Sequence, residues 1–237
     1  MAVDEVYQPA TMWEVVATTR WGRYTTEVAE SAILAAAEIA GTPGAALEVG
    51  CEGGRWSRLL SNMGWTLTCT DIDADVLAVC QQRVPTANCI HVSPRATTLP
   101  CAAQSASLLL CVEVFPVMDS SWFPKEANRA LSEDGVLVGV TLNSMSVRGM
   151  FVRAKQFLTG KSDFYSSSYF GWRRRMESAG FTIVFQRGYC WFPFTRSSNS
   201  SLAPFFIGIE RWLGLDRLTA LSPWVVFIAR KTSRPVD

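Results

Sequence analysis

The stretch ALEVGCEGGRW, residues 46–56, decides the fold, because an apolar segment runs directly into a glycine-rich turn. Glycines after a strand let the backbone approach a nucleotide closely. Two carboxylates, Glu48 and Glu52, flank this turn and disfavour a phosphate loop. The P-loop pattern is absent, and Glu52 and Arg55 stand where the pattern G-x-G-x-x-G needs glycine. The turn therefore suits a ligand that presents no phosphate here.

Outward from this turn, short apolar segments alternate with helical patterns, which is typical of a parallel sheet with crossover helices. Helices are also expected before the first strand, and a turn is expected at 133–135. The predicted strands are 45–49, 66–70, 88–92, 107–112, 136–141, 182–186 and 224–229, and the predicted helices are 10–19, 25–40, 55–62, 74–82 and 122–131.

Composition restricts the class of protein. The 237 residues are 49% hydrophobic and 18% charged, which allows a large core and argues against disorder. A net charge of +1 weighs against a nucleic-acid partner. Neither a signal peptide nor a membrane span is expected from the sequence, and seven cysteines without a CxxC pair indicate reduced core thiols. We therefore expect a cytoplasmic protein without a metal site.

An acid follows the second predicted strand as well. Asp71 comes 21 residues after Gly50 and can accept hydrogen bonds from ribose hydroxyls. Glu48 needs a different partner, and a ligand with an ammonium and a sulfonium group would supply one. S-adenosylmethionine carries both groups and a free ribose.

Four segments occur in order across about 44–143: LEVGCEGGRWS, CTDID, ATTLPCAAQSASLLLCVEVF and EANRALSEDGVLVGVTLN. Together they resemble the class I, Rossmann-like, S-adenosylmethionine-dependent methyltransferases, especially the type 11-like group that acts on small molecules. The resemblance implies an α/β fold with a seven-stranded, mostly parallel sheet flanked by helices, an antiparallel last strand and helical insertions. It also implies S-adenosyl-L-methionine as the cofactor.

We expect a single methyltransferase domain over 1–237. Its parts would be N-terminal helices at 1–43, a cofactor-binding core at 44–143, substrate-side elaborations around the sixth strand at 144–222, and the last strand and tail at 223–237.

The resemblance implies roles for the matching positions. The turn and Glu48 would hold the methionine part, Asp71 the ribose and Ile72 one face of the adenine. The predicted cofactor-binding residues are Glu48, Gly50, Cys51, Gly53, Gly54, Asp71, Ile72, Arg95, Ala96 and Val112. Glu113 is the candidate catalytic residue, as a general base, although a substrate contact or a structural hydrogen bond remains open for it.

Three positions depart from the family pattern. Glu52 stands where glycine is usual, and Arg95 stands where an aspartate often accepts the adenine amino group, which an arginine cannot do. Pro116 and Val117 replace the Glu-His pair of relatives that methylate quinone precursors, which argues against a metal there. The only histidine, His91, is expected to be structural.

Aromatic residues cluster where this family builds its substrate side. Packing of the extra helices and a pocket for an apolar acceptor are both open for them; the candidates are Trp13, Tyr24, Tyr165, Tyr169 and Trp191. An apolar stripe along 202–213 could face the core, cover the acceptor or touch a membrane surface. Eight basic residues against two acids at 144–187 indicate a solvated basic face, with an anionic acceptor or lipid surface as alternatives.

Methyl transfer to an oxygen or nitrogen of a small-molecule acceptor is the leading hypothesis. A non-catalytic or regulatory binder of the cofactor is the alternative, because of Glu52 and Arg95. A nucleic-acid methyltransferase is disfavoured by the near-neutral charge and by the absence of an N/D-P-P-Y motif. Membrane-surface contact is possible but not expected, and the sequence leaves the oligomeric state open.

Overall fold

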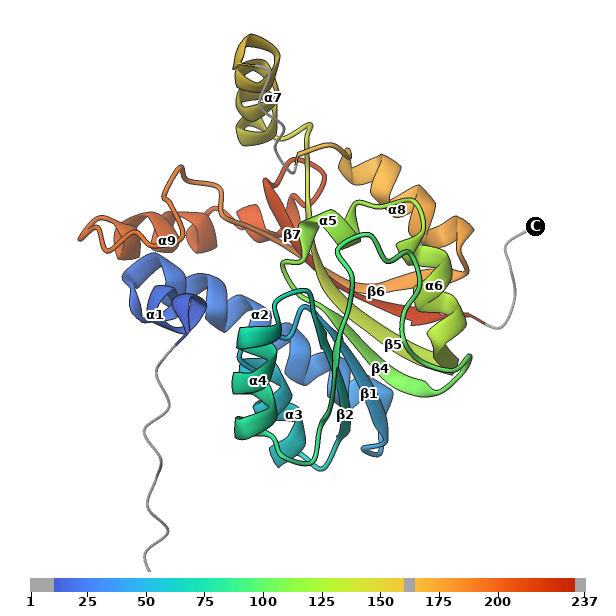
Figure 1. The fold of residues 1–237 in the computed structure, drawn as a ribbon. Helices are drawn as coiled ribbons and strands as arrows, with labels where there is room; N and C mark the ends of the chain where they lie inside the picture. Colours follow the sequence, from blue (N-terminus) through green and yellow to red (C-terminus); the bar gives the residue numbers. More distant parts are fainter. Residues whose placement is uncertain (1–10, 160–164, 233–237) are drawn as a thin grey trace, which may run out of the picture.

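The computed structural model describes residues 11–159 and 165–232. Seven strands form one sheet in the order β3-β2-β1-β4-β5-β7-β6 (Figure 1). The strands are β1 (Ala45–Val49), β2 (Thr66–Asp71), β3 (Asn88–His91), β4 (Ala106–Cys111), β5 (Leu131–Leu142), β6 (Phe181–Tyr189) and β7 (Trp224–Lys231). The expected Rossmann-like sheet is confirmed.

The order of the strands positions the site. From β1 the chain moves outward through β2 and β3, then returns to β4 on the other side of β1, and all of these neighbours pair in parallel. In such a sheet, ligands bind where the order reverses, outside the carboxyl ends of the strands. The antiparallel strand β7 lies between β5 and β6, far from this reversal.

Helices cover both faces of the sheet, because neighbouring strand residues point to opposite sides. Ala46 and Leu108 face a core built with α2, α3 and α4, whereas Leu47 and Leu109 face one built with α5, α6 and α8. The helices are α1 (Met12–Thr18), α2 (Arg20–Ala40), α3 (Arg55–Asn62), α4 (Ala74–Arg83), α5 (Phe115–Met118), α6 (Phe123–Ala130), α7 (Val147–Thr159), α8 (Tyr169–Ser178) and α9 (Ala203–Trp212), with a 3₁₀ turn η1 (Leu215–Arg217).

Two features of the secondary structure differ most from the predictions. Helix α2 begins at Arg20 instead of residue 25, because the Thr19 hydroxyl accepts the N–H of Gly22 and caps it early. The turn predicted at 133–135 lies inside β5 as an irregularity: the pairing with β4 shifts between Leu131 and Val136, and Asp134 has a φ of 61°. Residue 10 of the first predicted helix lies outside the described residues.

Within the described residues, the segments predicted as elaborations carry three α-helices and the turn η1. Helices α7 and α8 follow β5, and α9 lies between β6 and β7. In Figure 1, α7 stands out from the top of the molecule. Among the described helices, none is both long and apolar enough to cross a membrane.

Candidate active site

The glycine turn is shaped by backbone contacts with neighbouring segments. The N–H groups of Gly50 and Cys51 both donate to the carbonyl of Thr70, at 2.8 and 3.0 Å. Gly50 has a φ of 70°, and a Cβ there would lie 2.4 Å from Val114 Cγ2. Glycine is therefore required by both conformation and space, and the turn lies directly against the end of β4.

A cavity of about 970 Å³ opens at this turn, where the carboxyl ends of β1, β2, β3 and β4 meet. The turn forms one wall, and the segments that follow the other three strands form the rest. Helix α1 and Arg196 also contribute. The lining includes Thr11, Met12, Trp13, Gly50, Cys51, Glu52, Asp71, Ile72, Ala96, Val112, Glu113, Trp122 and Arg196. The structure thus brings most of the predicted cofactor residues to one space.

Asp71 lies at the edge of this cavity and organises two turns. Its Oδ2 accepts the N–H of Glu52 at 2.8 Å, and its Oδ1 accepts the N–H of Asp73 at 3.0 Å. A carboxylate has about four acceptor positions, so both oxygens retain capacity for further donors. Asp71 is therefore held in place and can still accept hydrogen bonds from hydroxyl groups.

Glu48 does not line the cavity, so the structure differs from the predicted contact with the methionine part. Its side chain is buried behind the turn, where Ser57 Oγ donates to it. Burial raises the pKa of Glu48 to about 8, which leaves the carboxyl mainly neutral at pH 7. The predicted role of Glu48 as the negative charge that selects a cation therefore stays a prediction, and its position behind the turn does not support direct contact.

Glu52 connects the turn to the N-terminal helix. It has a φ of 49°, and its Oε1 accepts the N–H of Trp13 at 3.4 Å. Negative charge near a helix N-terminus interacts favourably with the backbone N–H groups there. The residue that departs from the glycine pattern thus contacts α1, which covers one side of the cavity.

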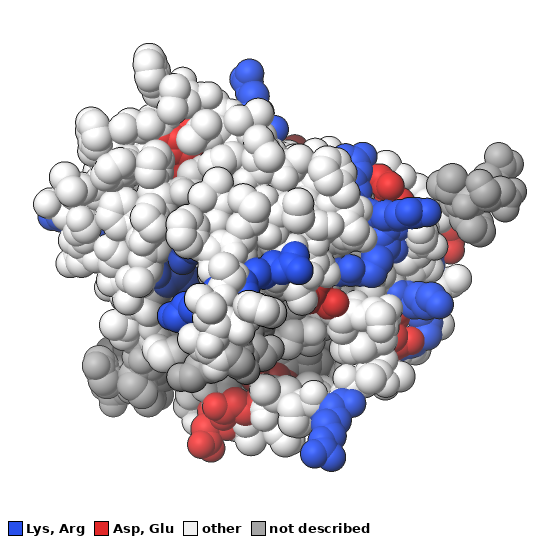
Figure 2. Space-filling view, turned by 90° about the horizontal axis from the view of Figure 1, so that it is seen from above, with Lys and Arg blue, Asp and Glu red and all other residues white. Residues whose placement is uncertain are grey.

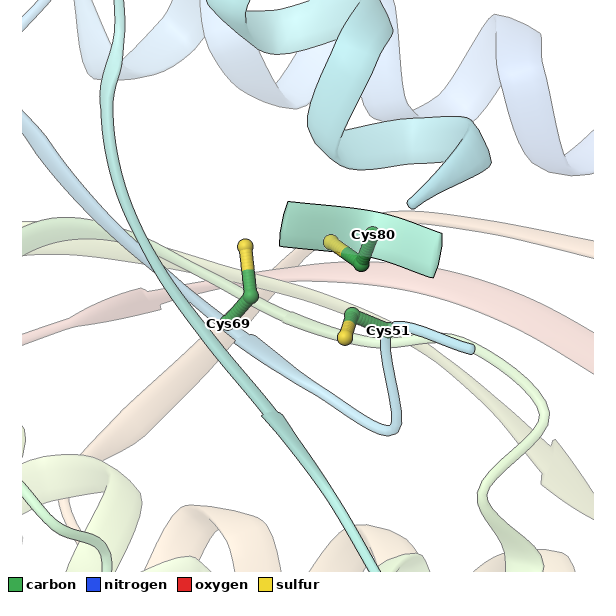
Figure 3. A group of neighbouring side chains, drawn as sticks. All are labelled: Cys51, Cys69 and Cys80. Atoms are coloured by element: carbon green, nitrogen blue, oxygen red, sulfur yellow. The ribbon is translucent and has the colours of Figure 1, made fainter. Parts of the chain in front are cut away.

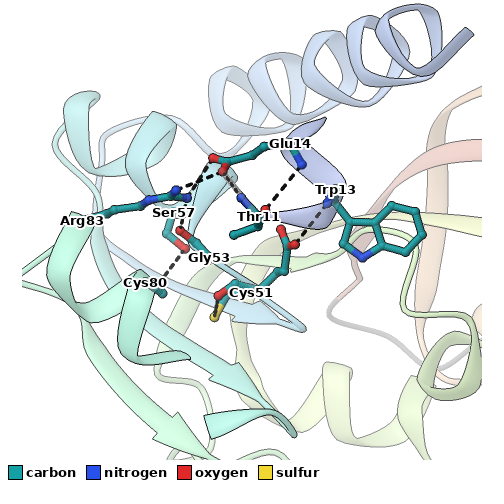
Figure 4. A network of polar contacts seen from close by, with 9 residues as sticks. Thr11, Trp13, Glu14, Cys51, Gly53, Ser57, Cys80 and Arg83 are labelled. Carbon is teal, nitrogen blue, oxygen red and sulfur yellow. Dashed lines mark hydrogen bonds and ion pairs between the residues drawn. The ribbon is translucent and has the colours of Figure 1, made fainter. Parts of the chain in front are cut away.

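A second contact attaches α1 to the same turn (Figure 4). Arg83 on α4 donates to both carboxylate oxygens of Glu14, at 2.8 and 2.9 Å, and to the carbonyl of Gly53 at 2.8 Å. Burial alone would raise the pKa of Glu14, but hydrogen bonds from Thr11 and Arg83 outweigh it and lower the pKa. We call Glu14, Arg83 and the Gly53 carbonyl the α1 latch.

Glu113 is held by an arginine from a distant segment. It lines the cavity just after β4, has a φ of 64°, and forms an ion pair with Arg196. The Arg196 guanidinium lies 4.3 Å from the centre of the Trp13 ring and 5.6 Å from that of Trp224. Burial lowers the pKa of Arg196 to about 10, so it stays charged at neutral pH. Glu113, Arg196 and Trp13 thus form a charged and aromatic part of the cavity wall.

Three other predicted cofactor residues lie outside the cavity. Arg95 is exposed and does not line it, whereas its neighbour Ala96 does. Gly53 and Gly54 lie behind the turn: Gly53 contacts Arg83, and Gly54, with a φ of 77°, precedes α3. They shape the turn and do not face the space inside.

Of the predicted substrate-side aromatics, only Trp13 lines the cavity. Tyr24 is buried against Glu210, Tyr165 accepts the indole N–H of Trp224, and Tyr169 bonds Gln186. The backbone N–H of Trp191 donates to Glu210. The hydroxyl groups of the three tyrosines thus have partners within the protein, and none of these four residues lines the cavity.

Some cavity residues were missed by sequence reasoning. Arg196 comes from a loop whose composition indicates only a polar connection, and Trp122 precedes a short helix. Thr11 and Met12 belong to the start of α1. No periodicity or motif distinguishes these positions, since only the packing of α1 and of the segments after β4 and β6 brings them to the cavity.

Three thiols lie together beneath the turn (Figure 3). The Sγ atoms of Cys51, Cys69 and Cys80 are all within 4.8 Å of one another, and the three residues are buried and free. They could offer sulfur ligands to a soft metal, so the expected absence of a metal stays a prediction. A Cβ at Gly54 would lie 2.7 Å from Cys80 Sγ, which shows how closely the turn packs on this group.

Comparisons with known proteins agree with this geometry. Residues 47–139 match the family model described as a methyltransferase domain. The match covers the segment from β1 to β5, and together with the fold it supports a class I, Rossmann-like, S-adenosylmethionine-dependent methyltransferase. The comparison with curated protein sequences finds no match.

Solved structures with the same fold are remote in sequence. An S-adenosylmethionine-dependent methyltransferase from Mesorhizobium loti is 17% identical, with a TM-score of 0.59 over 85% of this chain and 96% of that one. Geranyl diphosphate C-methyltransferase from Streptomyces coelicolor A3(2), in complex with S-adenosyl-L-homocysteine, is 17% identical, with a TM-score of 0.61 over 92% and 83%. The [4+2]-cyclase SpnF is 15% identical, with a TM-score of 0.57 over 89% and 81%. These likenesses define the fold alone.

Proposed function

We propose that this protein transfers the methyl group of S-adenosylmethionine to an oxygen or nitrogen of a small-molecule acceptor. The observation that carries the proposal is one cavity that joins the glycine turn, Asp71 and the Glu113–Arg196 wall. Its volume of about 970 Å³ lies within the range typical of small-molecule sites.

The cofactor would occupy the side of the cavity formed by β1, β2 and β3. The turn at Gly50 and Cys51 would approach the methionine part, and Asp71 would accept the ribose hydroxyls. Ile72 and Ala96 would contact the adenine, with Val112 on the floor. S-adenosylmethionine supplies a methyl group already activated on sulfur.

The acceptor would lie against Trp13, Trp122, Glu113 and Arg196. These residues would orient the attacking atom in line with the methyl and sulfur and exclude water. Arg196 contacts Oε2 of Glu113, so Oε1 would be the oxygen that accepts a proton from the acceptor.

Calorimetry with S-adenosylmethionine and S-adenosylhomocysteine tests cofactor binding. Asp71→Ala should weaken both ligands at least tenfold, whereas Glu38→Ala, on the exposed surface of α2, should not. Absence of binding by the wild type, or equal affinity of the Asp71 variant, would contradict the proposed site.

The alternative function is a non-catalytic or regulatory binder of the same cofactor. It is favoured by Glu52 and Arg95, where the family usually has glycine and aspartate. Labelled methyl transfer to candidate phenols, carboxylates and amines distinguishes the two. Methyl transfer to any one of these acceptors supports the enzyme, whereas tight cofactor binding with no transfer to any of them supports the binder.

A further inference from the structure

Helix α7 presents an apolar surface that the proposed function does not use. Six apolar residues recur at helical spacing along it, and all six are exposed: Val147, Met150, Phe151, Ala154, Phe157 and Leu158. Phe151 is 75%, Phe157 91% and Leu158 82% exposed. We call these six residues the α7 stripe. None of them lines the cavity, so the stripe is not part of the acceptor wall.

The stripe points away from the rest of the protein. The less exposed residues of α7 are Arg148, Gly149, Val152 and Gln156. With 3.6 residues per turn, this set and the α7 stripe are centred on opposite sides of the helix. A Cβ on Gly149 would lie 2.3 Å from the carbonyl oxygen of Asn143, and Val152 packs against the buried core. The helix is thus attached by its first turns while its apolar side faces outward.

Basic residues flank the stripe on both sides. In the same projection Arg148 and Lys155 border one edge of the apolar stripe and Arg153 borders the other. The segment 147–159 contains no aspartate or glutamate. An apolar side with basic flanks is the pattern of helices that lie in the interface of an anionic membrane, where long basic side chains reach the headgroups.

The surroundings of α7 agree with such a contact. Figure 2 looks onto the face from which α7 rises, and broad areas of this face are uncharged. Helix α9 also exposes apolar residues, among them Phe205 and Trp212, but it has only Arg211 as a basic residue. Since α9 lacks basic flanks, the inference concerns α7 alone.

We propose that α7 docks the protein on an anionic lipid surface, with the α7 stripe inserted among the acyl chains near the headgroups. Six adjacent exposed apolar side chains are uncommon on the surface of a protein that has no binding partner there. The positive charges favour a negatively charged lipid over a second copy of this chain, whose α7 would bring like charges together.

Vesicle co-sedimentation tests this proposal. Vesicles of phosphatidylcholine, with and without phosphatidylglycerol, are mixed with the full chain at low and high salt. The wild type should bind the phosphatidylglycerol vesicles more tightly, and salt should weaken this binding. The double variant Phe157→Ser/Leu158→Ser should lower the affinity at least about tenfold, because two exposed apolar side chains no longer insert. Arg153→Gln and Lys155→Gln should each lower it about fivefold.

Matched variants outside α7 are the controls. Phe185→Ser removes a half-exposed aromatic side chain of β6, and Arg174→Gln removes an exposed charge of α8. Both should bind vesicles like the wild type, and all variants should show the wild-type unfolding transition. The proposal is overturned if the wild type binds neither vesicle or if the α7 double variant binds equally well. It is also overturned if the wild type forms a concentration-dependent dimer but does not bind vesicles, and the double variant abolishes this dimer. The α7 stripe would then contact a second copy of the chain.

Discussion

Removing the Glu14 carboxylate is expected to weaken cofactor binding more than it weakens the fold. Helix α1 has no fully buried residue, so polar contacts hold it over the cavity. Its start supplies Thr11, Met12 and Trp13 to the lining. In Glu14→Ala the α1 latch is lost, and α1 should move away from the turn while the sheet and its cores stay folded.

The size of the effect follows from the geometry of the α1 latch. Arg83 donates two charge-assisted hydrogen bonds to Glu14, and the side chains of Arg83 and Glu14 are only 7% and 18% exposed. Such contacts contribute about 1.5–3 kcal/mol net. Arg83 keeps its hydrogen bond to the Gly53 carbonyl in the variant, so it is not left without a partner. We therefore apply this range once, to the two bonds with Glu14 together. If tight binding requires the closed position of α1, affinity should fall about 10- to 100-fold.

Calorimetry with S-adenosylhomocysteine measures this affinity, and denaturant unfolding measures stability. The control is Glu27→Ala, which removes an exposed carboxylate from α2. Because the pKa of Glu14 is lowered from its usual 4.5, the α1 latch contributes above that pH and is lost as pH falls through the lowered value. Wild-type affinity should therefore approach that of Glu14→Ala in acid. Affinity of Glu14→Ala within twofold of the wild type would refute the reasoning.

Three further substitutions test other parts of the site by denaturant unfolding. For Glu48→Gln, the free energy of unfolding relative to that of the wild type should rise by about 1–3 kcal/mol between pH 5 and pH 8. The reason is that the folded pKa of Glu48 is raised to about 8, so the wild type loses stability as pH rises through this window. Parallel pH profiles of the two proteins would contradict this. Glu113→Ala should cost about 1–3 kcal/mol, because the partly exposed Arg196 loses its ion-pair partner, and Arg196→Met in the same chain should recover much of that loss. Gly54→Ala should cost about 1–3 kcal/mol, because of its φ of 77° and the nearby Cys80 sulfur, whereas Gly208→Ala, with open space around it, should be neutral or stabilising. Equal effects of the two glycine changes would show that the turn tolerates a side chain.

The fold was largely predictable because its signals are local. Each strand was a short apolar run between turn residues, and α3 began directly after the glycine turn. The positions of Asp71 and of the turn were predictable as well, because both stand at strand ends in a parallel sheet. The start of α2 was predicted too late, since a single threonine hydroxyl decides it.

The roles of individual side chains were less predictable. Glu48 follows the family pattern, yet Ser57 on α3 binds it behind the turn. Glu52 departs from the pattern, and its carboxylate contacts Trp13, which lies 39 positions away in the chain. Arg95 faces solvent, while Arg196 occupies the cavity and pairs with Glu113. Contacts of this kind join distant segments and leave no periodicity in the sequence.

The sequence by itself determined the order of strands and helices, the glycine turn and the acid after β2, because hydrophobic periodicity and backbone conformation act over a few residues. Only the tertiary structure decided which carboxylates face the cavity, which arginines line it, and which apolar helix remains uncovered. The physical reason is that burial, ion pairing and exposure belong to side chains in contact across the fold. Glu48 and Glu52 lie four residues apart, yet the Glu48 side chain is buried behind the turn, whereas the Glu52 carboxylate accepts a hydrogen bond from α1.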